Sequence, residues 1–162
     1  MRKLNLFILL IFIISGSAMA QNKAEVIKFN RLENIITEQN ENIQVINFWA
    51  TWCAPCIKEL PYFEALPETI NGRSLHVTLI NIDFVEKLDK VNSFIERKAM
   101  TSDVLLLDNI DYNSWIDRVD KSWSGAIPAT LIVDSKTGKR KFIEGELKED
   151  ELNNILKEFT KP

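Results

Sequence analysis

The stretch that decides the fold is Trp49-Ala50-Thr51-Trp52-Cys53-Ala54-Pro55-Cys56, within a chain of 162 residues. It holds the only two cysteines of the chain, three positions apart. Such a pair closes a disulfide across one turn or supplies two thiolates to a metal. A structural zinc site needs two further cysteine or histidine ligands, and His76 is the sole histidine. The sequence therefore favours a disulfide-forming pair and predicts no metal ligand.

The cysteines lie where a predicted strand gives way to a predicted helix. Gln44 to Trp49 is an apolar run typical of a buried strand, and the apolar positions from Ile57 to Leu66 have helical spacing. Free backbone N–H groups and the helix dipole favour negative charge at a helix N-terminus. We therefore expect Cys53 to have a lowered pKa and to be the nucleophile, and Cys56 to be the resolving thiol. The alternative is a static disulfide or two unreactive thiols.

The sequence around the pair resembles the active-site segment of thioredoxin-fold proteins. The resemblance rests on Phe48 to Cys56 and on Pro61, five residues further on. It is closer to the extracytoplasmic TlpA/ResA-like branch, because Asn47 stands where cytoplasmic thioredoxins carry a buried aspartate and Glu59 matches a helix carboxylate of that branch. Members of the branch are thiol-disulfide oxidoreductases that typically act as reductants. The resemblance implies the same activity here, with the cysteine pair as the redox-active disulfide and no further cofactor.

The resemblance also implies roles for residues around the pair. Glu59 would take up or supply the proton of Cys56, and the alternative is an ordinary solvated helix glutamate. Pro128 stands before a predicted strand, Thr130 to Val133, where the family carries a cis-proline packed against the cysteines. The backbone of Ile127 would then pair with an extended substrate segment. The residues expected to contact substrate are Trp52, Ala54, Pro55, Ile127 and Pro128.

The hydrophobic pattern along the rest of the chain predicts an α/β fold. Strands are expected near 24–29, 44–49, 75–82, 104–107, 130–133 and 141–144, and helices near 30–40, 57–66, 88–99, 112–120 and 148–159. Asn30 and Glu33 are expected to cap the first helix. The resemblance implies a thioredoxin-like fold with a central mixed sheet and helices on both faces. The segments near 88–99 and 104–107 resemble the central insertion of the TlpA/ResA-like branch.

Residues 1–20 have the pattern of a signal peptide. Arg2 and Lys3 precede an apolar run from Leu6 to Ile14, and Ala18-Met19-Ala20 is a small-residue cleavage site. We expect cleavage after Ala20, which leaves residues 21–162 as one thioredoxin-like domain in the periplasm, where disulfides persist. The alternative is an uncleaved segment that tethers the domain to the inner membrane.

Charge limits the classes of partner. Residues 21–162 carry 18 basic and 23 acidic side chains, a net charge of −5, without a basic cluster, which argues against nucleic acid. We expect a monomer whose partners are protein disulfides or dithiols and a membrane electron donor of the thiol-reducing type. By resemblance, apocytochrome c thiols are candidate substrates, and cytochrome c maturation a candidate role. Two alternatives remain: a DsbA-like oxidant or isomerase, and a non-enzymatic thioredoxin-fold binding module.

Overall fold

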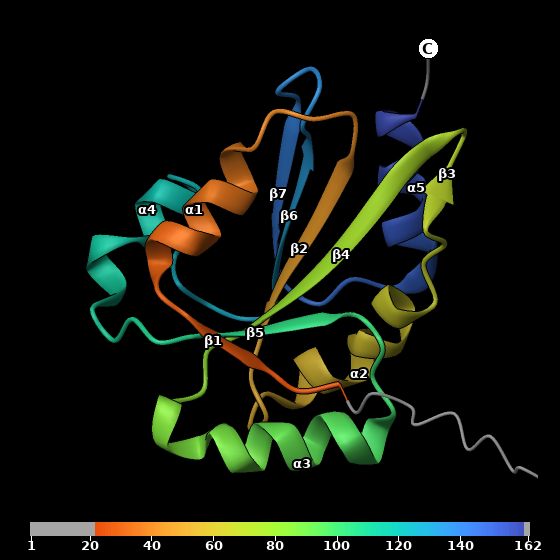
Figure 1. Cartoon of the computed structure of the whole chain (residues 1–162). Helices are drawn as coiled ribbons and strands as arrows, with labels where there is room; N and C mark the ends of the chain where they lie inside the picture. Colours follow the sequence, from red (N-terminus) through yellow and green to blue (C-terminus); the bar gives the residue numbers. More distant parts are fainter. Residues whose placement is uncertain (1–21, 161–162) are drawn as a thin grey trace, which may run out of the picture.

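The computed structural model describes residues 22–160, which form a mixed β-sheet with helices on both faces (Figure 1). The strands are β1 (Glu25–Ile27), β2 (Ile43–Trp49), β3 (Thr69–Ile70), β4 (Arg73–Asn81), β5 (Asp103–Leu107), β6 (Ala129–Asp134) and β7 (Arg140–Glu144). The helices are α1 (Phe29–Thr37), α2 (Ala54–Glu64), α3 (Leu88–Lys98), α4 (Ile116–Val119) and α5 (Glu149–Phe159), with 3-10 turns η1 (Val85–Lys87) and η2 (Tyr112–Ser114). The predicted signal peptide lies outside the described residues. Within residues 22–160 no helix is long and apolar enough to cross a membrane.

The sheet is built around β2. Its strand order is β1-β5-β4-β2-β6-β7, with β3 paired to β4 at the side. β2 runs parallel to β4 and antiparallel to β6, and all seven of its residues are buried. A strand that is covered on both faces has a continuous apolar sequence, which is why the run before the cysteines is so hydrophobic. The cysteine pair follows the end of this central strand.

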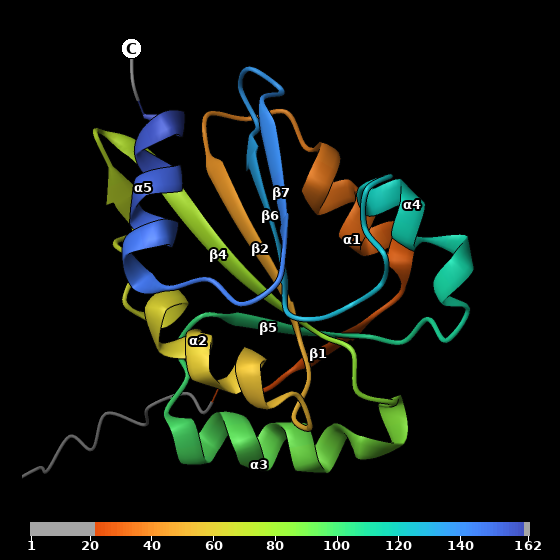
Figure 2. The same cartoon turned by 180° about the vertical axis from the view of Figure 1, so that it is seen from behind.

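Helices cover both faces of the sheet. α1 and α4 lie together on one face, and α2 and α5 lie on the other, with α3 beside α2 (Figures 1 and 2). Each long helix turns an apolar stripe inward, as amphipathic helices do. On α1 the stripe includes Leu32 and Ile36, and on α5 it includes Leu152 and Leu156. These contacts confirm the predicted α/β class with a central mixed sheet.

The central insertion adds a strand to the sheet. α3 and β5 come between β4 and β6 in the chain, and β5 lies between β1 and β4 in the sheet. β5 runs parallel to both neighbours. The carboxyl ends of β2, β4 and β5 therefore meet at one edge of the sheet, the edge at which the cysteine pair begins α2.

Two predicted helices differ from the structure. The first helix is not capped by Asn30 and Glu33: it begins at Phe29 after the N-cap Lys28, because the buried Phe29 ring stacks on Trp115 with centroids 5.9 Å apart. Glu33 instead forms a salt bridge of 2.6 Å with Arg118. The predicted helix near 112–120 is divided into η2 and α4, because the backbone at Trp115 leaves helical geometry while its indole enters the core.

Candidate active site

Cys53 and Cys56 form a disulfide at the N-terminus of α2. Their Cα atoms are 5.3 Å apart. Cys53 is the N-cap residue, and its Sγ accepts a hydrogen bond of 3.3 Å from the backbone N–H of Cys56. Cys53 is 5% exposed and Cys56 is fully buried. Of the two cysteines, only Cys53 has any exposed surface, and it lies at a helix end that favours negative charge.

The residues between and before the cysteines form the open surface of the site. Trp52 is 63% exposed, and Ala54 and Pro55 are exposed as well. Pro55 falls in the first turn of α2, where its missing N–H costs no helical hydrogen bond. The three predicted substrate-contacting residues of this segment therefore lie on the surface around the Cys53 sulfur.

A buried carboxylate holds the loop that leads to Cys53. Asp83, which is 4% exposed, accepts hydrogen bonds of 2.7 Å from both the backbone N–H and the hydroxyl of Thr51. Asn81 donates a third, of 2.9 Å, to the same carboxylate. The sequence analysis missed Asp83. The signal was its place two residues after the end of β4. β4 is parallel to β2, so the two strands end at the same edge of the sheet.

The predicted cis-proline segment, Ile127 and Pro128, lies against the disulfide. The Ile127–Pro128 peptide bond is cis, as the resemblance implied. The carbonyl oxygen of Ile127 lies 3.8 Å from the Cys53 Sγ. Ile127 is half-buried, and Pro128 is buried immediately before β6. Residues 74 positions apart in the chain thus meet at the sulfur.

Two anchors fix the position of this proline loop. The indole N–H of Trp123, a buried residue, donates a hydrogen bond of 2.8 Å to the carbonyl of Ala126, and Trp123 packs on Phe48 with ring centroids 4.5 Å apart. From the other side, the backbone N–H of Gly145 donates a bond of 2.8 Å to the carbonyl of Pro128. Trp115 is also buried, at 1% exposure. Both tryptophans are therefore core residues that support the loop.

Glu59 is fully buried and lies one turn of α2 after Cys56. Its carboxylate accepts a hydrogen bond of 2.8 Å from the Asn47 side chain and one of 2.7 Å from the backbone N–H of Leu147. Burial raises the pKa of Glu59 to about 7, and the two hydrogen bonds oppose that rise only in part. Near neutral pH this carboxyl group is therefore able both to take up and to release a proton.

Asn47 is the neutral partner of that carboxylate. Its amide nitrogen also lies 3.1 Å from the Thr130 hydroxyl and 3.4 Å from the Ala129 carbonyl, while its own oxygen has no partner among the described residues. An aspartate at this position would place a second negative charge against Glu59, which the asparagine avoids. Turning the amide over would present its oxygen to a protonated Glu59, so Asn47 suits both protonation states.

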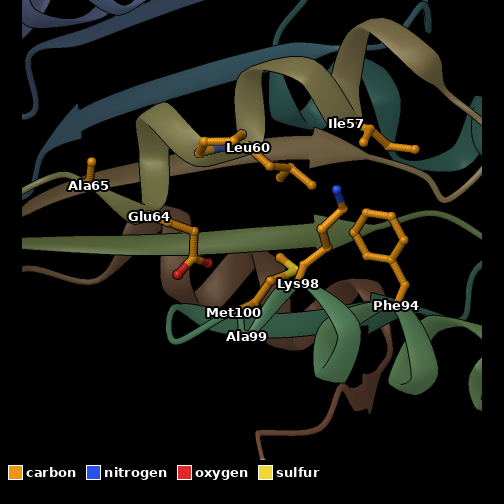
Figure 3. Close-up of a pocket in the computed structure, with 9 residues that line it drawn as sticks. Ile57, Leu60, Glu64, Ala65, Phe94, Lys98, Ala99 and Met100 are labelled. Carbon is orange, nitrogen blue, oxygen red and sulfur yellow. The ribbon is translucent and has the colours of Figure 1, made fainter.

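A groove of about 300 Å³ runs along the other flank of α2, between α2 and α3 (Figure 3). Its walls are the apolar side chains of Ile57, Leu60, Phe94 and Met100. Figure 3 shows Lys98 reaching from α3 toward α2 across this groove. No predicted site residue lines it, so it is separate from the cysteine centre. Across residues 22–160 no group of three His, Cys, Asp or Glu side chains could hold a metal.

Comparison with curated proteins places the chain among thiol-disulfide proteins. The AhpC/TSA family matches residues 20–139. The thiol-disulfide oxidoreductase ResA of Geobacillus thermodenitrificans is 27% identical over 134 residues, which are 80% of this chain and 70% of that protein. The thioredoxin-like protein YneN of Bacillus subtilis is 33% identical over 96 residues, which are 57% of this chain and 50% of that protein. The matches thus cover between half and 70% of the lengths of these relatives.

Among solved structures, the chain is similar to a thioredoxin-related protein from Neisseria meningitidis serogroup B. The TM-score is 0.58, with 25% identity over 71% of this chain and 82% of that one. This likeness confirms the thioredoxin-like fold that the sequence implied.

Proposed function

The chain belongs to the AhpC/TSA family, and from that premise we propose that it is a thiol-disulfide oxidoreductase whose redox centre is the Cys53–Cys56 pair. One observation carries the proposal. A disulfide at a helix N-terminus lies against the Ile127–Pro128 peptide, with Cys53 slightly exposed at 5% and a fully buried carboxyl group one helix turn after Cys56. Relatives named thiol-disulfide oxidoreductase support it. A static disulfide needs none of these surroundings.

In the first step the reduced protein attacks a substrate disulfide. The Cys53 thiolate lies at the helix N-terminus and accepts a hydrogen bond from the backbone N–H of Cys56. It forms a bond to one of the two substrate sulfurs. The other substrate sulfur leaves with the electron pair of the broken bond and takes a proton. The substrate backbone lies along Ile127, next to the exposed Trp52. The product of this step is a mixed disulfide on Cys53.

In the second step Cys56 resolves the mixed disulfide. Glu59 takes the proton of the Cys56 thiol, and the new thiolate attacks the Cys53 sulfur. The Cys53–Cys56 disulfide forms, and the remaining substrate sulfur leaves as a thiolate that is then protonated. Two electrons have passed from the protein dithiol to the substrate disulfide. A pKa of about 7 suits Glu59 to this transfer near neutral pH, and Asn47 keeps the carboxyl group in place.

We further propose that the protein works as a reductant in the periplasm. The signal-peptide pattern of residues 1–20 and the resemblance to the TlpA/ResA-like branch support this location and direction. A reductant in that compartment needs a supply of electrons, because the surroundings keep disulfides oxidised. A membrane electron donor of the thiol-reducing type would reduce Cys53–Cys56 after each cycle. Apocytochrome c thiols, which such a reductant would keep reduced, remain candidate substrates on the same grounds.

The experiment that tests this function traps the intermediate. Cys56→Ser removes the resolving thiol, so Cys53 should accumulate as a mixed disulfide with protein substrates on a non-reducing gel. Cys53→Ser is the matched control, since it leaves one thiol in the same helix and should trap nothing comparable. The wild-type dithiol should also reduce insulin, whereas a binding module would not. The proposal would be contradicted if Cys56→Ser formed no mixed disulfides and the wild-type protein did not reduce insulin.

A further inference from the structure

Residues 144–147, which we call the linking segment, connect the end of β7 to the loop before α5. Each of the four residues makes a polar contact with a distant part of the chain. The first two contact the segment around the cis-proline, and the last two contact α2 at and next to Glu59. The linking segment thus joins two parts of the redox centre that lie far apart in the sequence.

The first half of the linking segment holds the cis-proline segment. The carboxylate of Glu144 accepts hydrogen bonds of 2.7 Å from both the backbone N–H and the hydroxyl of Ser124, three residues before Ile127. The backbone N–H of Gly145 donates a bond of 2.8 Å to the carbonyl of Pro128. Gly145 has a φ of 116°, a conformation that residues with a side chain rarely adopt. The chain is therefore able to turn at Gly145, directly after it has bound Pro128.

The second half of the linking segment holds Glu59. Leu147 is buried, and its backbone N–H donates a hydrogen bond of 2.7 Å to the Glu59 carboxylate. Glu146 forms a salt bridge of 2.5 Å with Lys58, the residue directly before Glu59 on α2. The side chains of this pair are 31% and 68% exposed. The hydrogen bond to Glu146 raises the pKa of Lys58, which keeps the pair charged near neutral pH. A charged pair at the surface thus lies one residue away from each partner of the buried bond.

The charge of Glu146 acts on Glu59. Burial is the main cause of the raised pKa of Glu59, and the negative charge of Glu146 raises that pKa further. The other groups that face Glu59 are the Cys56 sulfur, one turn earlier on α2, and the uncharged side chain of Asn47 on β2. The acidic side chains in the first turn of α5, which also packs on α2, are exposed to solvent. Glu146 and its partner Lys58 are therefore the charges through which the surface reaches the buried carboxyl group.

We propose that Lys58 and Glu146 are positioning residues for the proton transfer from Cys56 to Glu59. Their ion pair keeps the linking segment closed on α2, which holds the backbone N–H on the Glu59 carboxylate and keeps water away from it. The inference rests on the proposed thiol-disulfide exchange, in which Glu59 takes this proton in the second step. Because the pair acts through Glu59, its loss should slow the second step and leave the attack by Cys53 unchanged.

The test separates the two steps with a small neutral disulfide, dithiodipyridine. Attack of the Cys53 thiolate breaks the S–S bond of the probe, leaves one half of it on Cys53 and releases the other half as thiopyridone. Attack of Cys56 on the Cys53 sulfur then closes the protein disulfide and releases the second thiopyridone. Stopped-flow absorbance follows one equivalent in each phase. With the reduced wild-type protein, the rate of the second phase should rise with pH as Glu59 loses its proton.

Variants assign the effect to the ion pair. Lys58→Gln and Glu146→Gln should each slow the second phase about 3- to 10-fold at neutral pH and change the first by less than about 2-fold, because only the proton acceptor is displaced. The charge-reversed pair, Lys58→Glu with Glu146→Lys, should recover most of the lost rate. Glu158→Gln is the matched control: it breaks the exposed pair with Lys141 of β7 and should change neither phase. All these pairs are exposed, so the variants should keep the fold, which circular dichroism checks.

The pH profile distinguishes positioning of the proton acceptor from a purely structural role. Both single variants lose the ion pair, so they share any loosening of the linking segment. They differ only in the charge that is left near Glu59, which is a carboxylate in Lys58→Gln and an ammonium in Glu146→Gln. A negative neighbour raises the pKa of a carboxyl group, and a positive one lowers it. The midpoint of the second phase should therefore lie about 0.5–1 pH unit higher in Lys58→Gln than in Glu146→Gln.

The outcomes separate this inference from the function on which it rests. A second phase of wild-type rate and midpoint in both single variants would overturn the positioning role and leave the oxidoreductase standing. Equal slowing of both phases, with no difference in midpoint, would also refute it, because the pair would then support only the general structure of the site. A wild-type protein that released no thiopyridone would refute the exchange reaction itself.

Discussion

Glu59 is an ionisable group that the fold removes completely from water. Its contacts to Asn47 and Leu147 satisfy the carboxylate, yet burial still raises its pKa to about 7 from an ordinary value of 4.5. The unfolded chain releases this proton near pH 4.5, whereas the folded chain keeps it until about pH 7. The folded state thus binds more protons across that interval, and the free energy of unfolding falls as pH rises through it.

Replacing this carboxyl group by an amide should remove that pH dependence. Glu59→Gln stays neutral, and its amide is able to donate to the oxygen of Asn47 once the Asn47 amide has turned over. We expect the variant to be more stable than the wild type by about 1–3 kcal/mol at pH 8 and nearly equal to it at pH 4. Urea denaturation at both pH values measures this. The rate of insulin reduction should fall, because the proton acceptor is lost.

Glu96→Gln serves as the control for this change, since Glu96 is exposed on α3. It should alter neither the stability nor the turnover. If the wild type and Glu59→Gln lost stability equally between pH 4 and pH 8, the buried carboxyl group would not be the titrating residue.

Asp83 acts on the nucleophile through the loop before it. In the wild type, both carboxylate oxygens of Asp83 accept hydrogen bonds from Thr51 and Asn81. Asp83→Asn keeps only one of these oxygens and places an NH₂ group against hydrogen-bond donors. We expect the free energy of unfolding to fall by about 1–3 kcal/mol and the pKa of Cys53 in the reduced protein to change. Thr51→Val keeps the backbone bond to Asp83 and should show a smaller loss, near 1 kcal/mol. The thiolate absorbance of the reduced protein, measured against pH, gives the pKa of Cys53. The same pKa in the wild type and in Asp83→Asn would mean that Asp83 has only a structural role.

At the scale of elements, the sequence predicted those strands and helices that a single strong hydrophobic pattern determines. The apolar run of β2, the helix that follows it and the stripe of α5 were all predicted close to their observed bounds. The cap of α1 was wrong, because burial of Phe29 outweighs the capping preference of Asn30. The short strand β3 and the break at Trp115 were missed, because both depend on tertiary contacts.

The candidate site divides in the same way. The cysteine pair, Glu59 and Pro128 are recognisable from spacing and resemblance. Asp83 and the loop of Gly145 and Leu147 are not, because backbone N–H groups and a single aspartate leave no pattern in a sequence. They reach the centre only when β4 and β7 have been placed beside β2 and β6.

The far end of the sheet has its own ion pair, which joins β4 to β6. Arg73 forms two hydrogen bonds to Asp134, of 2.8 and 2.6 Å, and Asp134 is only 4% exposed. The guanidinium of Arg73 holds the pKa of Asp134 well below its usual range. Because the folded pKa is depressed, the stabilisation is present above the ordinary value of 3.8 and is lost as pH falls below it.

Breaking this pair should destabilise the sheet without changing the chemistry. We expect Asp134→Asn to lower the free energy of unfolding by about 2–4 kcal/mol at pH 7, because it leaves a partly buried guanidinium unpaired. Glu158→Gln, which removes an exposed partner of Lys141, should cost less than about 1 kcal/mol. Guanidinium denaturation compares the two. Equal losses would mean that the pair adds no more than a surface contact.

At the scale of the whole molecule, the chemistry occupies one edge and the structural supports lie elsewhere. The loops after β2 and β4 and the loop before β6 meet around the Cys53 sulfur, where Trp52 is exposed. The Arg73–Asp134 pair lies at the opposite end of the strands. This separation allows the surface around the sulfur to set substrate choice while the sheet keeps its geometry.

The most direct test of the central claim is the reduction potential of the Cys53–Cys56 couple. The protein would be equilibrated with dithiothreitol and glutathione buffers at neutral pH, and its dithiol and disulfide forms separated after alkylation. As a reductant, it should have a potential toward that of thioredoxin, about −270 mV. A potential toward that of DsbA, about −120 mV, would contradict the reductant and make the protein an oxidant or isomerase. A disulfide that failed to exchange with either buffer would contradict the redox centre itself.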